Sequence, residues 1–553
     1  MRGPLIAPIR IAGVLVAFLF AAALAGCGGG GGGSSGGDPT PPPPPPPGDA
    51  QFRVSGTSPF AAGCDGVPAA GTLYLNAEVE PMVAVNPRNP QNVIGVWQQD
   101  RWSTGGARGL LTGVSLDGGQ TWGTHMAAFS RCTGGNAANN GDYPRATDPW
   151  ISFAPDGVVY QSSLSFSGNV LGPASSSALL VSRSTDGGQS WSTPAVLIHD
   201  GAQAFNDKDA ITADPTDPRF VYAVWDRLDS DTHGPAYLNR TIDGGVTWEL
   251  ARAIYDPGPN RQTINNQVVV LPNGTLVDFF TQLNAAPNQP ANAQISLVRS
   301  SDKGATWSAP IVVSPSLAIG THDPDTNQSI RDAASLGSFA AGPAGELVAA
   351  WQDARFSNGQ RDGIAFSRST DGGVTWSAPV QINSVAATQA FLPTVTVRAD
   401  GMIGVTYYDL RDNTADPAAL PTGIWLTRSS DGVTWRETRV SGPFDLSIAP
   451  IDGGLFVGDY QALTSIGAVF VPFYAQTNIG NLANRTDVFV TLATSAIATA
   501  TAAGPGVAAT SGESVMRAQP AQAFSMTPEF QQKVHDSVVR TISRRLGRAP
   551  RTP

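Results

Sequence analysis

The sequence has 553 residues, of which 41% are hydrophobic and only 14% are charged, and its formal net charge is −10. The 61 Gly and 44 Pro residues favour short strands joined by tight turns over a helical protein. The acidic balance argues against a nucleic-acid-binding protein, because such a protein needs a basic surplus to neutralise phosphates.

The chain begins with the pattern of an exported protein. Arg2 and Arg10 precede an apolar run, residues 11–24, that is too short to span a bilayer comfortably. The run ends in Leu24-Ala25-Gly26-Cys27, which resembles the lipobox of bacterial lipoproteins. That resemblance implies that residues 1–27 are a signal peptide, that Cys27 is lipidated, and that the protein is anchored in the bacterial cell envelope, facing the periplasm or the exterior. An ordinary signal peptide with a chance cysteine is the alternative.

Residues 28–50 are rich in Gly and then in Pro, which predicts a flexible and then semi-rigid tether. If Cys27 is lipidated, only Cys64 and Cys132 remain, and export to an oxidising compartment favours a disulfide between them. Two cysteines without a nearby histidine cluster make a poor metal site. The sequence also has no His-Glu-x-x-His motif, no Walker loop and no dinucleotide fingerprint following a strand, so no metal and no cofactor is predicted.

Six copies of a short motif, close to Ser/Thr-x-Asp-Gly-Gly-x-Thr-Trp, follow one another along the chain. They begin at Ser115, Ser184, Thr241, Ser300, Ser369 and Ser429. The Asp accepts hydrogen bonds from its own turn, Gly supplies positive φ, and the Trp ring packs beside a neighbouring strand. The motif resembles the Asp-box (BNR) repeat of the sialidase superfamily of β-propellers, over nearly all of residues 75–495. These aspartates are expected to be structural.

Each copy lies in a unit with four expected strands, which is the repeat of a propeller blade. A seventh unit without the motif begins at Gly458-Asp459-Tyr460 and ends at residues 487–492, and its missing outer strand would come from residues 51–55. The sequence therefore predicts an all-β protein, a β-propeller over residues 51–496. Seven blades are favoured, and six, the number in sialidases, is the alternative.

The C-terminal part changes character. Residues 497–526 are rich in small residues and predict a linker. Residues 527–547 predict a short helix with Thr527 as N-cap and Pro528 in its first turn. An apolar stripe is formed by Phe530, Val534, Val538, Ile542 and Leu546, and the other side is basic. Such a helix either docks on the propeller or contacts an anionic membrane surface.

Propeller topology places two sets of residues on the face opposite the Asp boxes. The first set precedes or opens the inner strands and includes Glu80, Asp148, Asp209, Asp332 and Tyr460. The second set ends the following strands and includes Arg101, Arg227, Arg355 and Arg411. Arg binds carboxylates in a fork and paired carboxyl groups can act as acid and base, so this mixture suits a sugar.

In sialidases a Tyr nucleophile is activated by Glu, an Asp is the acid/base, and three Arg bind the sialic acid carboxylate. By position, the resemblance implies Tyr460, Asp148 and Glu80 as catalytic residues. Substrate binding falls to Arg101, Arg227, Arg355, Arg411, Asp209 and Asp332. The family's Phe/Tyr-Arg-Ile-Pro motif is absent, and the same residues would also serve as salt bridges between blades.

The function expected is that of a monomeric cell-surface, sialidase-like glycoside hydrolase acting on carbohydrate, including acidic glycans. A non-catalytic propeller that binds glycans or proteins is the alternative, and a lyase or other polysaccharide-active enzyme on the same fold is a third.

Overall fold

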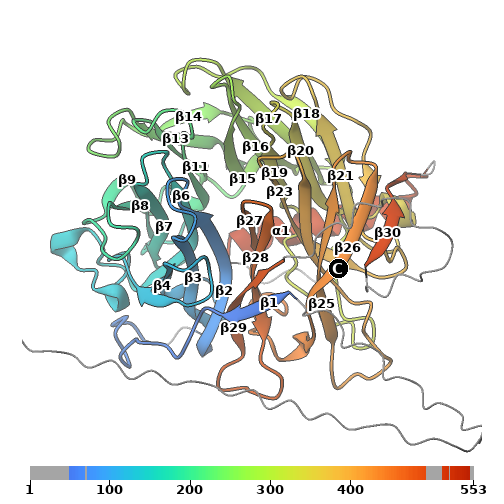
Figure 1. The fold of residues 1–553 in the computed structure, drawn as a ribbon, viewed down its shortest axis with the longest axis horizontal. Coiled ribbons are helices and arrows are strands. Elements are labelled where there is room, and N and C mark those ends of the chain that lie inside the picture. The colour runs from blue at the N-terminus through green and yellow to red at the C-terminus, as the bar shows by residue number, and fades with distance from the viewer. Residues whose placement is uncertain (1–48, 69–70, 494–512, 522–523, 548–553) are drawn as a thin grey trace, which may run out of the picture. The chain divides into compact units, whose positions relative to one another are not determined.

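The structure is a computed structural model that describes residues 49–68, 71–493, 513–521 and 524–547 (Figure 1). Cys27, the predicted signal peptide and nearly all of the predicted tether lie outside these residues. Within the described ranges, no helix is both long and apolar enough to cross a membrane.

The strands pair into successive antiparallel groups of four, numbered here from 1 in chain order. Group 1 has β2 (Leu73–Val85), β3 (Val93–Trp102), β4 (Ala107–Ser115) and β5 (Gly123–His125). Group 2 has β6 (Arg145–Phe153), β7 (Val159–Ser167), β8 (Ser176–Ser184) and β9 (Ala195–Asp200). Group 3 has β10 (Phe205–Ala213), β11 (Val221–Leu228), β13 (Ala236–Thr241) and β14 (Arg252–Tyr255).

The remaining strands continue this order. Group 4 has β15 (Arg261–Val270), β16 (Leu276–Asn284), β17 (Asn292–Ser300) and β18 (Ile311–Ser316), and β12 (His233–Gly234) pairs with β15. Group 5 has β19 (Ser338–Ala341), β20 (Leu347–Asp353), β21 (Gly363–Ser369) and β22 (Val380–Gln381). Group 6 has β23 (Ala390–Val397), β24 (Ile403–Asp409), β25 (Pro421–Ser429) and β26 (Thr434–Asp445). Group 7 has β27 (Ala462–Ile466), β28 (Val469–Thr477), β29 (Thr486–Leu492) and, from the other end of the chain, β1 (Ala50–Arg53).

The two ends of the strand array meet in group 7. β1 pairs antiparallel with β29, from Ala50 opposite Leu492 to Arg53 opposite Phe489, which confirms the predicted origin of the outer strand. The first strand of each group contacts the first strands of the neighbouring groups, and β27 contacts β2. The chain is thus an all-β propeller. The preference for seven blades over six stays a prediction. It requires seven groups of four strands, and the strands pair into seven such groups.

The Asp boxes are hydrogen-bonded turns between the third and fourth strands of groups 1 to 6. In the first box, Asp117 Oδ1 accepts from Ser115 Oγ at 2.8 Å and from the Thr121 amide at 2.9 Å. Gly118 and Gly119 have φ of 77° and 96°, which only Gly adopts easily. The Trp122 ring lies 5.8 Å from Phe473 of group 7. The box therefore fixes its hairpin and helps to join neighbouring groups.

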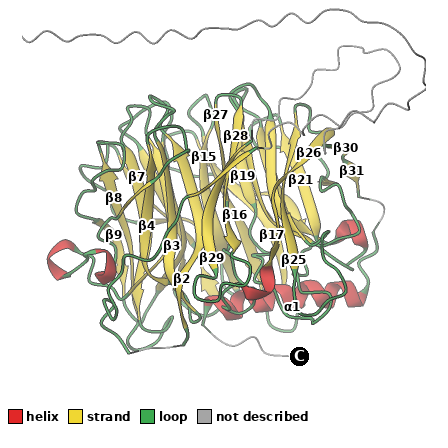
Figure 2. Ribbon diagram, turned by 60° about the horizontal axis from the view of Figure 1, so that its bottom comes forward, coloured by secondary structure: helices red, strands yellow, loops and turns green. Residues whose placement is uncertain are grey.

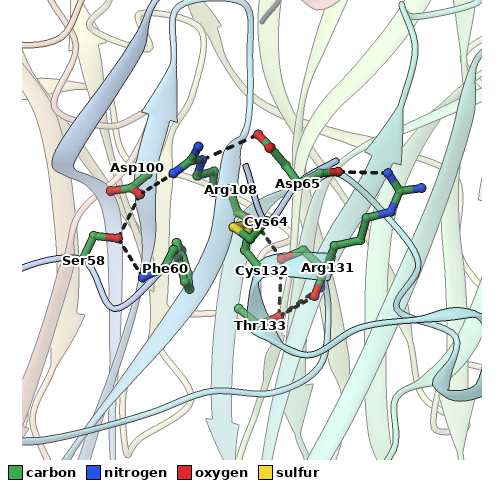
Figure 3. Close-up of a disulfide and its surroundings, with 10 residues drawn as sticks. Ser58, Phe60, Cys64, Asp65, Asp100, Arg108, Arg131, Cys132 and Thr133 are labelled. Atoms are coloured by element: carbon green, nitrogen blue, oxygen red, sulfur yellow. Dashed lines mark hydrogen bonds and ion pairs between the residues drawn. A yellow bond between two sulfur atoms is a disulfide. The ribbon is translucent and has the colours of Figure 1, made fainter. Parts of the chain in front are cut away.

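A disulfide joins Cys64 and Cys132, which are 68 residues apart (Figure 3). Beside it, Arg108 lies 3.6 Å from Asp65 and 3.7 Å from Asp100. The bond ties the segment before group 1 to the segment that follows it.

The C-terminal extension differs in part from its prediction. Within the expected linker 497–526, β30 (Ser514–Arg517) pairs with β26 and β31 (Gln519–Pro520) pairs with β22. Outer strands present unpaired backbone groups that accept any extended segment, whatever its composition. The helix α1 follows at Pro528–Arg545, and Figure 2 shows it lying across one end of the strands. It docks on the propeller, which is the first of the two expected arrangements.

Candidate active site at the propeller mouth

Five of the seven inner strands have the same irregularity. In β2, β6, β10, β15 and β23 the pairing slips at a bulge. One residue at each bulge has positive φ, namely Glu80, Asp148, Lys208, Asn265 and Leu392, with values between 49° and 64°. Non-glycine residues resist this conformation, and bulges with such strain cluster at functional sites because they redirect side chains.

Lys208 is the centre of the polar network that results. Its Nζ lies 3.0 Å from Asp148 Oδ1, 2.6 Å from Asp459 Oδ2 and 3.8 Å from Glu80 Oε1. The four residues come from groups 1, 2 and 3 and from the loop before group 7. One cation therefore joins three carboxyl groups that are far apart in the sequence. We call these residues, together with Arg331, Arg101 and Asp452, the mouth network.

Two arginines extend the network. Arg331 Nε donates to Asp459 Oδ1 and its Nη1 donates to Asp452 Oδ2, both at 2.9 Å. Arg101 donates to the same Asp452 oxygen. Both guanidinium groups lie over the Phe456 ring, 4.4 Å from its centroid for Arg331 and 4.7 Å for Arg101. Such cation–π contacts add to the ion pairs in holding the cations in place.

Glu80 and Asp459 are neighbours with opposite pKa shifts. Burial raises the pKa of Glu80 to about 8; Lys208 opposes the rise, and Asp148 and Asp459 add to it. Burial alone would also raise the pKa of Asp459, but Arg331 and Lys208 hold it well below its usual range. At neutral pH Glu80 therefore carries a proton beside an ionised carboxylate. Two neighbouring carboxyl groups whose pKa values are shifted in opposite directions can act as the acid and the base of one reaction.

Tyr460 lies beside the network without a base on its hydroxyl. Its Oη donates to the Pro149 carbonyl at 3.2 Å, and its ring meets the Trp150 ring edge-on at 5.4 Å. Burial, with Glu80 and Asp148, raises the pKa of Tyr460 well above its usual value. A nucleophilic Tyr needs the opposite arrangement, a neighbouring base or a lowered pKa.

The structure does not bring Arg227, Arg355 and Arg411 together as a grip for one substrate carboxylate. Arg227 binds Asp200 at 2.7 and 2.8 Å. Arg355 binds Asp353 at 2.7 and 2.8 Å, and Arg411 binds Asp409 and Glu437, each at 2.6 Å. An Arg two residues after an Asp at a strand end folds back onto that Asp, so the repeated pattern holds the strand end. Arg101 alone among the four predicted arginines reaches the mouth network.

The two other predicted acids are buried and hydrogen-bonded, Asp209 in β10 and Asp332 in the loop before β19. Asp209 accepts from Ser162 Oγ at 2.5 Å, and its pKa is raised by burial and by Asp148. Asp332 accepts from the Thr321 amide at 2.5 Å and from Gln352 Nε2 at 2.9 Å.

Several residues of the mouth network have no role in the prediction. Lys208 and Arg331 do stand in the first set of positions, next to acids, which is the available signal. Asp452, and Phe456 on which the two arginines of the network pack, lie in an irregular loop that carries no motif.

A cavity of about 220 Å³ adjoins the network. It is lined by Trp150, Asn265, Phe339 and Leu392 of the inner strands and by Tyr460 of the loop before β27. Aromatic rings and amide groups around such a space offer stacking and hydrogen bonds to a small polar ligand.

Comparison with family models finds the repeat. A model of the BNR repeat-like domain matches residues 237–445. A xyloglucanase from Paenibacillus sp. is 28% identical over 232 residues, which cover 41% of this chain and 21% of the xyloglucanase. The chain thus matches about a fifth of the length of that relative.

Solved structures similar to this chain include a Hadza microbial sialidase, at 17% identity and a TM-score of 0.41, covering 73% of this chain and 75% of the sialidase. An α-L-arabinofuranosidase of Fusarium graminearum in complex with arabinobiose is 12% identical, with a TM-score of 0.40, covering 60% of this chain and 88% of that one. A protein of unknown function from Dyadobacter fermentans is 16% identical, with a TM-score of 0.41, covering 60% and 90%.

Proposed function

We propose that the chain is a glycoside hydrolase whose site is the mouth network. The observation that carries the proposal is a proton-bearing Glu80 beside Asp148 and Asp459, with Lys208 joining all three. Cleavage of a glycosidic bond needs a protonated carboxyl group and a second carboxylate across the bond. The similarity to a xyloglucanase over part of the chain also supports it.

Each carboxyl group has a distinct role in this proposal. Glu80 donates its proton to the oxygen of the leaving sugar as the glycosidic bond breaks. Asp148 takes a proton from the water that attacks the anomeric carbon. We assign this role to Asp148 and not to Asp459 because Asp459 forms ion pairs with two cations, Lys208 and Arg331, whereas Asp148 pairs with Lys208 at 3.0 Å. Asp459 stays ionised and stabilises the positive charge of the oxocarbenium-like transition state.

The charge of the network favours a neutral glycan as substrate. With Glu80 protonated, the three cations Arg101, Lys208 and Arg331 match the aspartates at 148, 452 and 459 in number. Sialidase activity is the narrower form of the proposal, and it would need Tyr460 as nucleophile.

Release of reducing sugar tests both forms. The purified full-length protein and its variants Glu80→Gln, Asp148→Asn and Tyr460→Phe are incubated with xyloglucan, other neutral glycans and a fluorogenic sialoside. We expect Glu80→Gln to lower the turnover of a neutral glycan by about 10²–10⁴-fold and Tyr460→Phe to retain it. Release from the sialoside that Tyr460→Phe abolishes would instead support the sialidase. If the proteins bind glycan but none of them releases sugar, the result would favour the alternative, a non-catalytic propeller that binds glycans.

We also propose that the protein is a lipoprotein of the bacterial cell envelope. The Cys64–Cys132 disulfide supports an oxidising compartment. Metabolic labelling with a fatty-acid analogue should mark the full-length protein and not Cys27→Ser, and equal labelling of both would contradict the anchor.

A further inference from the structure

The helix α1 crosses the face of the propeller that carries the mouth network. Near its start Phe530 packs with Leu317 and Ala354 of the group 4 to group 5 region. In its middle Val538 packs with Ile264 of β15. The residue after its last turn, Leu546, packs among side chains of groups 2 and 3. The apolar stripe of the helix therefore packs on the propeller over its full length. Figure 2 shows the helix lying across one end of the strands.

Arg545 anchors the C-terminal end of α1 in a pocket of complementary groups. Its Nε lies 3.0 Å from Asp207 Oδ2, and its Nη1 donates to Gln262 Oε1 at 2.9 Å and to the Thr263 carbonyl at 3.0 Å. Its Nη2 donates to Asp226, which is fully buried. A buried guanidinium with four partners is a specific docking contact. Asp207 directly precedes Lys208, so this contact adjoins the mouth network.

Arg544 and Arg540 close the neighbouring side. Arg544 Nη2 donates to the Gly453 carbonyl at 2.8 Å, next to Asp452 of the network. Arg540 Nη2 donates to the Ile319 carbonyl at 2.7 Å. The proposed catalytic residues Glu80 and Asp148 are each 1% exposed; Lys208 lies against both, and α1 reaches their surroundings through Asp207 and Gly453. A sugar ring cannot reach either carboxyl group in this state.

We propose that α1 is an autoinhibitory lid, which blocks the mouth when docked and admits a polysaccharide when it leaves. This inference rests on the proposed function for the identity of the ligand. Thr527 Oγ1 accepts from the Phe530 amide at 3.2 Å and so caps the N-terminus of α1. Turnover then scales with the fraction of molecules whose lid is open.

Two full-length variants move the lid in opposite directions. Ser335 Oγ and Thr541 Oγ1 lie 3.0 Å apart, so Ser335→Cys with Thr541→Cys is suited to a disulfide that locks α1 in place. Arg545→Met removes the guanidinium and leaves Asp226 buried without its partner, which favours release. The matched controls are the single variant Thr541→Cys and the exposed substitution Gln531→Ala.

Amide hydrogen exchange of residues 528–545 measures how readily α1 undocks. Reducing-sugar release from xyloglucan measures turnover at the mouth network. We expect faster exchange and about tenfold or greater turnover in Arg545→Met, and slow exchange with lost turnover in the oxidised double-cysteine variant, restored by reductant. Thr541→Cys, treated with the same reductant, corrects for reduction of Cys64–Cys132.

The outcomes separate the two proposals. Equal turnover in the locked, native and released forms overturns the lid and leaves the hydrolase intact. If no form shows turnover, the proposal that the chain is a hydrolase is overturned. Retardation of the protein in a xyloglucan-containing gel then tests whether α1 acts as a lid. Retardation of the released form alone supports it, and equal migration of all forms overturns it.

Discussion

Replacing Glu80 by Gln has an effect on stability that depends on pH in a calculable way. The Glu80 side chain is 1% exposed, and burial raises its pKa from 4.5 to about 8. The folded protein therefore holds this proton more tightly than the unfolded chain does, by about 5 kcal/mol at about 1.4 kcal/mol per pKa unit.

The sign follows from proton binding. Below pH 4.5 both states are protonated and Glu80 carries no penalty. As the pH rises through the window from 4.5 to about 8, only the unfolded chain loses the proton, so the free energy of unfolding falls, and above 8 the fall stops. A neutral Gln has no such dependence. The stability of Glu80→Gln relative to the native protein should therefore increase by about 5 kcal/mol across this window.

Urea denaturation of both proteins near the two ends of the window measures this difference. The Gln98 Nε2 group, which donates to Glu80, meets a less suitable partner in the variant, but that cost is the same at both pH values and cancels. Glu529→Gln, at an exposed position on α1, is the control. A change in relative stability below about 1 kcal/mol would refute the buried, protonated Glu80.

Three further predictions concern stability and are read from urea or thermal denaturation. Both carboxylate oxygens of Asp278, on β16, lack a hydrogen-bond donor among the described residues, and burial raises the pKa of Asp278. Asp278→Val should therefore raise the free energy of unfolding by about 1–3 kcal/mol, and by more at pH 7 than at pH 4. A loss of stability at both pH values contradicts this. Replacing Cys64 and Cys132 by Ser should cost about 4 kcal/mol for a loop of 68 residues, and an unchanged Tm would contradict that cost. Asp243→Ala should cost about 1–3 kcal/mol, because Asp243 accepts from the Thr247 amide at 2.9 Å and from Thr241 Oγ1 at 2.8 Å; an unaltered Tm would show that the Asp box is dispensable.

The features that were predictable from the sequence are those that short-range chemistry specifies. The Asp box is one hydrogen-bonded turn, so its residues predict it wherever it recurs. The strand at Ala50–Arg53 was predictable because an unfilled outer position in the last unit needs one extended segment. The helix at Pro528–Arg545 follows from a cap and a four-residue apolar spacing.

The mouth network depends instead on how groups distant in sequence face one another. Arg227 and Arg331 are alike as residues, but Arg227 meets Asp200 of the neighbouring group, whereas Arg331 meets Asp459 from the far end of the chain. No local pattern distinguishes these two. The pairing of Ser514–Arg517 with β26 was equally hidden, because edge strands recognise backbone and not side chains.

The most direct test of the central claim is the pH profile of sugar release from xyloglucan by Arg545→Met, compared with Arg545→Met carrying Glu80→Gln. If Glu80 is the proton donor, turnover of the first protein falls on the alkaline side as Glu80 loses its proton, and the second protein loses most turnover at every pH. Unchanged turnover and an unchanged alkaline limb in the Gln variant would contradict a catalytic site at this mouth.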